Sequence, residues 1–168
     1  MTLCQTIAID FDNEMKSTRK LLERVPLDDA HRGYKPHEKS MPLERLATHV
    51  ADLPRWPKMA LESEVFELQP GFKPVIASST AELLEIFDKS VEEGRASIAG
   101  TADADMQKTW TFKFGDQVAF SDVRTKVLRS FINHLVHHRA QLGVYLRLNG
   151  IPIPGMYGPS ADDPWPPK

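Results

Sequence analysis

Apolar residues recur at helical spacing in four separate segments of the chain. In the first segment, Ile7, Phe11 and Met15 fall on one side of a helix, as expected for a face that packs against a core. Clusters of proline, glycine and polar residues separate the segments and mark the loops. The spacing predicts four helices, from about Leu3 to Glu23, from about Ser40 to Trp56, from about Ser79 to Gly100 and from about Ser121 to Asn149.

Two features modify this helical pattern. Pro54 and Pro57 fall inside the second predicted helix, where each removes a backbone donor and crowds the preceding turn, so we expect a kink or a break there. Ahead of the fourth helix, the sequence TWTFKFGDQVAF contains two short strand-like runs around Gly115 and Asp116. These runs predict a hairpin or an extended crossover.

Together these elements predict an all-α fold in a single domain over residues 1–168. The expected architecture is a four-helix bundle with a long connection between the third and fourth helices, in which a short hairpin can form. The tail after Gly150 is too rich in proline and glycine for regular structure, and we expect it to fold back over the bundle.

Composition narrows the class of protein. Lysine and arginine (21) nearly balance aspartate and glutamate (23), without a basic block, which argues against nucleic-acid binding. The single cysteine, Cys4, excludes an internal disulfide framework and a cysteine-based zinc site. Because no apolar run approaches the roughly 20 residues of a membrane helix and the N-terminus lacks a secretion signal, we expect a cytoplasmic protein without a membrane partner.

Three histidines carry the candidate chemistry. His134 and His138 lie about 40° apart on the otherwise apolar face of the fourth helix, and His49 lies on the apolar face of the second. Facing helices pack 8–10 Å apart, so the three imidazoles can reach one ion and leave a coordination position open. Nitrogen ligands suit zinc, nickel, iron or copper. The alternative is that these are core histidines satisfied by hydrogen bonds.

The remaining histidines are weaker candidates. His137 is rotated about 100° from His138, and we expect it to support a neighbouring imidazole or to contact another helix. His31 and His37 fall in a polar loop, where exposed side chains are expected.

The segment HLVHHRAQLGVYLRLNG, with LATHVADLPRW before it and MYGPSADD after it, resembles the DinB/YfiT-like family of metal-dependent enzymes. This is the helical damage-inducible family and not the DNA polymerase that shares the name. The resemblance implies a four-helix bundle that binds one divalent metal ion, often nickel or zinc, through His49, His134 and His138. It also implies a homodimer and a small-molecule substrate.

Three functions follow from such a site. The wider superfamily includes enzymes that use low-molecular-weight thiols, so the first hypothesis is a metal-dependent transferase that activates a thiol. The second is a metal-dependent hydrolase that uses metal-bound hydroxide. The third is a non-catalytic bundle stabilised by the metal. The sequence disfavours a peptidase of the H-E-x-x-H type, because no carboxylate stands inside the histidine pair.

Five other residues are candidates for roles in catalysis or cofactor binding. Asp52 could orient a ligand imidazole or move a proton, or it could be a solvated carboxylate. Trp56 and Tyr145 could form walls of the pocket, with Tyr145 offering a hydroxyl, although core packing is favoured for both. Arg139 and Gln141 could bind an anionic cofactor or tie the fourth helix to the tail, and we favour the structural role.

Overall fold

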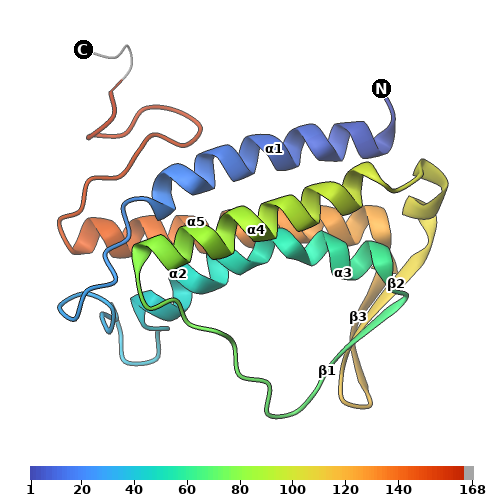
Figure 1. Cartoon of the computed structure of the whole chain (residues 1–168), viewed down its shortest axis with the longest axis horizontal. Helices are drawn as coiled ribbons and strands as arrows, with labels where there is room; N and C mark the ends of the chain where they lie inside the picture. The colour runs from blue at the N-terminus through green and yellow to red at the C-terminus, as the bar shows by residue number, and fades with distance from the viewer. Residues whose placement is uncertain (165–168) are drawn as a thin grey trace.

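The computed structural model describes residues 1–164, so the last four residues of the predicted tail, 165–168, lie outside the described residues (Figure 1). Its helices are α1 (Leu3–Leu22), α2 (Leu43–Asp52), α3 (Trp56–Glu62), α4 (Thr80–Ala99) and α5 (Arg124–Leu148), with the 3₁₀ helices η1 (Leu53–Arg55) and η2 (Asp103–Gln107). Its strands are β1 (Val65–Leu68), β2 (Thr109–Phe114) and β3 (Gln117–Val123). The long helices pack side by side, with the sheet at one end and the tail at the other (Figure 1).

The expectation of an all-α fold is wrong, because the three strands form a mixed sheet in the order β1-β2-β3. The predicted hairpin is present: β2 and β3 pair antiparallel around Gly115, whose φ is +54°. Strand β1 was not predicted. It is four residues long and pairs in parallel with β2, Val65 opposite Thr111, and local spacing does not reveal a partner so distant in sequence.

Two helix boundaries follow from local chemistry. Pro54 and Pro57 break the second predicted helix into α2, η1 and α3, as expected. The last helix begins at Arg124 and not at Ser121, because Ser121 pairs with Thr111 in the sheet. Gly150 ends it with φ of +70°, a left-handed conformation that favours glycine.

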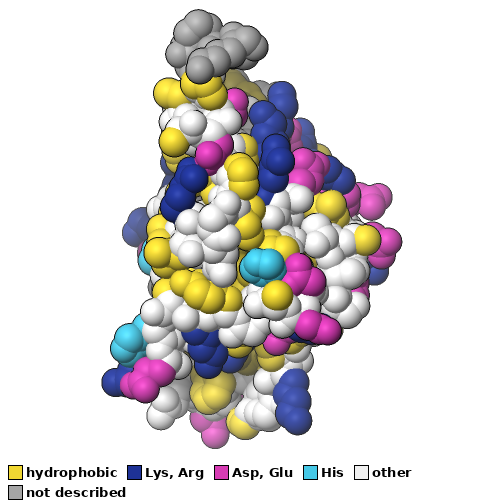
Figure 2. Space-filling view, turned by 90° about the vertical axis from the view of Figure 1, so that its left-hand side faces the viewer, with side chains coloured by type: hydrophobic (Ala, Val, Ile, Leu, Met, Phe, Trp, Pro, Cys, Tyr) yellow, Lys and Arg dark blue, Asp and Glu magenta, His cyan; other side chains and the backbone are white. Residues whose placement is uncertain are grey.

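The tail folds back over the bundle, as the sequence predicts. Ser160 Oγ donates to the Ile153 carbonyl at 2.6 Å, and an Asp162 carboxylate oxygen accepts from the Ile153 backbone N–H at 3.0 Å. The same carboxylate pairs with Arg147 of α5. Hydrophobic side chains remain visible among charged ones at this end of the molecule (Figure 2). Over residues 1–164, none of the helices combines the length and apolar character needed to cross a membrane.

A close backbone approach fixes the broken helical segment against α4. Leu53 and Pro54 are both buried in η1, and the Pro54 carbonyl faces Gly94 of α4. A Cβ atom on Gly94 would lie 2.0 Å from that carbonyl oxygen and 3.3 Å from Cζ of Phe11. Only glycine therefore permits η1 to pack this closely on α4.

We expect the substitution Gly94→Ala to lower the free energy of unfolding by about 1–3 kcal/mol, because backbone atoms must move apart. Helix propensity alone would instead raise it by up to about 1 kcal/mol. Gly143→Ala in α5 is the matched control, since nothing lies within 4 Å of its added Cβ, and it should stabilise the protein. Chemical denaturation of both variants measures the difference. A Gly94→Ala protein as stable as the control would contradict the close approach.

Candidate metal centre

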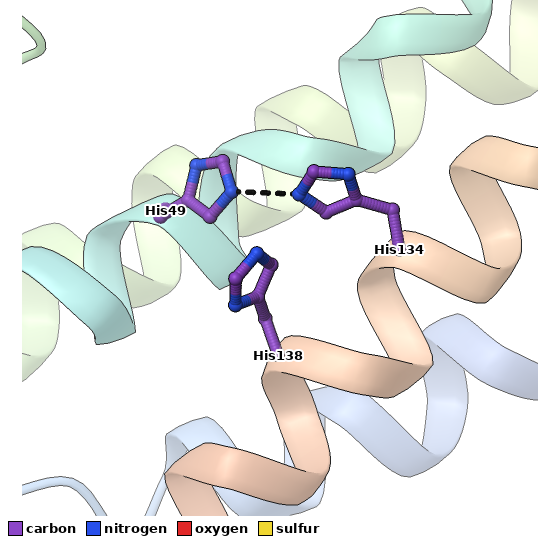
Figure 3. Close-up of side chains that lie close together, drawn as sticks. All are labelled: His49, His134 and His138. Carbon is purple, nitrogen blue, oxygen red and sulfur yellow. Dashed lines mark hydrogen bonds between the residues drawn. The ribbon is translucent and has the colours of Figure 1, made fainter.

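The structure brings His49, His134 and His138 together, although they come from helices far apart in sequence (Figure 3). His49 lies in the last turn of α2, just before the proline break, and the other two lie one turn apart in α5. Each imidazole points toward the space between the two helices (Figure 3). All three side chains are partly buried, so each keeps some exposure to solvent.

The spacing of the nitrogens suits a shared ion. His49 Nε2 and His134 Nε2 are 3.1 Å apart, and one ligand nitrogen from each histidine lies within 4.8 Å of the others. Two nitrogens bound at about 2.0–2.1 Å to one ion lie roughly 3 Å apart in neighbouring positions and at most about 4.2 Å apart. A small rotation of a side chain therefore suffices to place all three around one ion. The donor set fits a divalent metal.

Electrostatics keeps these imidazoles neutral. Burial, followed by the nearby imidazoles, lowers the pKa of both His49 and His134 to about 4. Burial also lowers the pKa of His138. Because the neutral form predominates at neutral pH, the ring nitrogens keep the lone pairs that a metal needs.

Gln141 orients one of the three rings. His138 Nδ1 and Gln141 Oε1 are 2.7 Å apart, and since the amide oxygen accepts, Nδ1 carries the proton and Nε2 keeps its lone pair. A ring nitrogen of His138 points toward the other two histidines (Figure 3). This contact was not predicted from the sequence, although the spacing of three residues on one helix was a signal for it.

Trp56 packs against the histidine group, in agreement with one of its two predicted roles, that of a wall of the pocket. Its ring centroid lies 5.8 Å from that of His49 and 5.2 Å from that of His134. Phe131, which the sequence analysis did not select, supports it in an edge-to-face contact at 5.4 Å. These two rings form an apolar wall on one side of the site.

Asp52 lies beside this wall and not against an imidazole. Its carboxylate pairs with Arg55 at 2.5 Å, and Trp56 Nε1 lies 3.5 Å from its other oxygen, a long contact. Within residues 1–164, no hydrogen bond joins Asp52 to one of the three histidines. Asp52 is therefore placed to orient the ring of Trp56, and not a metal-binding imidazole.

The other two candidates lie away from the imidazoles. The Tyr145 hydroxyl donates at 3.0 Å to the carbonyl of Met41, which lies just before α2. Arg139 is 2% exposed and donates to the Glu14 carbonyl and to Thr18 Oγ1, both at 3.1 Å. These contacts tie α5 to α1, and Arg139 also donates to the Tyr157 hydroxyl at 2.8 Å, which ties α5 to the tail in the structural role favoured from the sequence.

His137 also lies outside the group. It is exposed, and its ring centroid is 5.0 Å from that of His138. His31 Nδ1 is hydrogen-bonded to Asp28 Oδ1 at 2.7 Å, in the polar loop where exposed side chains were expected. In the described part of the chain, the group that could hold an ion contains these three histidines and no aspartate, glutamate or cysteine.

The chain resembles known proteins in its sequence and in its fold. The model of the DinB family matches residues 5–167. A DinB-like protein from Bacillus cereus ATCC 10987 is 18% identical and superimposes with a TM-score of 0.69, covering 91% of this chain and 97% of that one. A DinB-like protein from Bacillus subtilis is 19% identical and superimposes with a TM-score of 0.65, covering 88% of this chain and 96% of that one. At these identities the structures show a shared fold. No curated protein matches the chain.

We expect Gln141→Leu to weaken metal binding by roughly 10–100-fold, because His138 loses the acceptor that fixes its proton and ring orientation. Competition with a chelator of known affinity measures the change for added zinc. His137→Ala is the control, since this exposed side chain lies outside the group. Equal affinities in Gln141→Leu and the wild type would remove Gln141 from the site.

Proposed function

The chain belongs to the DinB family, and from this membership and its three convergent histidines we propose that it is a metal-dependent transferase that activates a low-molecular-weight thiol. The family resemblance identified from the sequence is confirmed by the match over residues 5–167. The proposed cofactor is one divalent ion, nickel or zinc, held by His49, His134 and His138.

The absence of a carboxylate from the group supports a thiol in particular. Among the described residues, no aspartate or glutamate joins the three histidines, and Asp52 is engaged by Arg55. A general base must lie within hydrogen-bond reach of the proton that it removes. Free thiols have a pKa of about 8.5, far below the pKa of water, so a thiol needs less help to ionise. When bound, a divalent ion supplies that help by lowering the pKa of a coordinating thiol.

The chain's own residues would hold and shield this reaction. Three neutral imidazoles would hold the ion, and Gln141 would keep the Nε2 lone pair of His138 available to it. Trp56 and Phe131 exclude water from one side, while the partial exposure of the histidines leaves another side open to a small substrate. The proton released by the thiol can pass to solvent at this open side.

Two other functions remain as outcomes of the test. A hydrolase would act on an ester without added thiol. A non-catalytic metal clip would join α2 to α5 across the 85 residues that separate His49 from His134, and it would add stability without turnover. The partial exposure of all three histidines supports a reactive centre over a closed clip.

The test begins with protein purified without a metal-affinity tag, in which elemental analysis should find about one nickel or zinc ion per chain. His49→Ala and His134→Ala should hold less than about a tenth of that amount, and His137→Ala should keep it. The metal-loaded protein should then transfer 2-mercaptoethanol to 1-chloro-2,4-dinitrobenzene. In this reaction a carbon–sulfur bond forms, chloride leaves and the thiol proton goes to solvent.

Each alternative result has a distinct meaning. Hydrolysis of 4-nitrophenyl acetate without thiol, together with no thiol transfer, would favour the hydrolase. Loss of stability on metal removal, with neither activity, would favour the clip. Full metal content in His134→Ala would contradict the proposed ligands.

Family membership also supports a homodimer, which we keep as a proposal. Sedimentation velocity should then give a mass of about twice the chain mass of 19.0 kDa at micromolar concentration. A particle of 19.0 kDa across the same concentrations would contradict it.

A further inference from the structure

The two sides of the histidine group differ in chemistry. Contacts between the α2–α3 segment and α5 occur in antiparallel order, namely Met41 with Tyr145, His49 with His134, and Trp56 with Phe131. The aromatic wall therefore lies on the side of His49 toward α3. A residue one turn before His49 lies on the opposite side, at the level of His138 and Gln141.

Arg45 occupies that position. It is exposed, and a spacing of four residues places it on the same face of α2 as His49.

This arginine has no ion-pair partner within residues 1–164. Both acidic residues of α2 already have ion-pair partners. Asp52 pairs with Arg55 at 2.5 Å, and Glu44 pairs with Arg32 at 2.7 Å. The acidic groups of α2 are thus occupied elsewhere, and the guanidinium of Arg45 keeps its donors for a ligand.

The three candidate ligands carry no negative charge. Three imidazoles are neutral, and no carboxylate or thiolate of the described chain joins them to offset the charge of a divalent ion. With Arg45 one turn away, a divalent ion bound by the three imidazoles would give this side of the centre a net positive charge. Such a site attracts an anion more than a neutral or cationic molecule.

We propose that Arg45 is a specificity-determining residue that binds an anionic group of the substrate, a carboxylate or a phosphate, while the rest of the substrate reaches the histidine group. A guanidinium matches either oxyanion with paired donors. This inference rests on the proposed function, and it specifies the substrate as a small thiol that carries a negative charge apart from its sulfur.

The experiment uses nickel-loaded protein and two thiols of similar size, the anionic 3-mercaptopropionate and the neutral 2-mercaptoethanol. Binding is followed by thiolate-to-nickel charge-transfer absorption, and nickel content is checked after each titration. The variants are Arg45→Ala and Arg45→Lys. The matched control is Arg24→Ala, which removes another exposed arginine from the loop after α1.

Arg45→Ala should weaken binding of 3-mercaptopropionate about five- to tenfold and leave 2-mercaptoethanol unchanged. Arg45→Lys should retain part of the preference, and Arg24→Ala all of it. Comparing the two thiols in each protein cancels their intrinsic difference in affinity for nickel.

An equal loss for both thiols, no loss for either, or a fall in nickel content in Arg45→Ala would overturn the inference about Arg45 and leave thiol binding intact. Absence of a thiol signal from nickel-loaded wild type would instead overturn the proposed function, and this inference with it.

Discussion

The candidate metal centre depends on how closely the broken segment from α2 to α3 packs against both α4 and α5. Gly94 lets the Pro54 carbonyl approach α4 to a distance at which any side chain would collide. From that fixed position, the segment presents His49 just before the break and Trp56 just after it. Both rings then meet α5, within 6 Å of the His134 ring centroid. The proline break and the glycine contact are thus parts of the same site.

The histidine group combines burial with an incomplete set of partners. Burial disfavours the charged imidazolium, and three clustered imidazoles disfavour it further because each charge would repel the others. His49 and His134 can share only one proton between their facing nitrogens at 3.1 Å. Gln141 satisfies the outer nitrogen of His138, and within residues 1–164 the inner one has no hydrogen-bond partner. This arrangement is well suited to accept a cation that needs lone pairs.

The sequence predicted the parts of this molecule that depend on local spacing. Helical periodicity located the four helical segments, and the two prolines located the break in the second. The positions of His49, His134 and His138 on apolar faces predicted that they would lie together, as they do. The parallel strand β1 was missed because its pairing with β2 depends on residues far apart in the chain. The engagement of Asp52 by Arg55 was missed because two side chains one turn apart can choose among several partners.

The contacts that fix the rotation of α5 about its own axis lie on the side of the helix away from the metal centre. Arg139 follows His138 directly, so it points about 100° away from it, toward α1. There its guanidinium pairs with the Glu14 carboxylate at 2.7 Å and donates to the Tyr157 hydroxyl of the tail at 2.8 Å. A buried guanidinium without these partners would cost several kcal/mol, so this contact strongly disfavours other rotations of the helix. Because one rigid helix carries all three side chains, the bonds of Arg139 to α1 and the tail direct His134 and His138 toward α2.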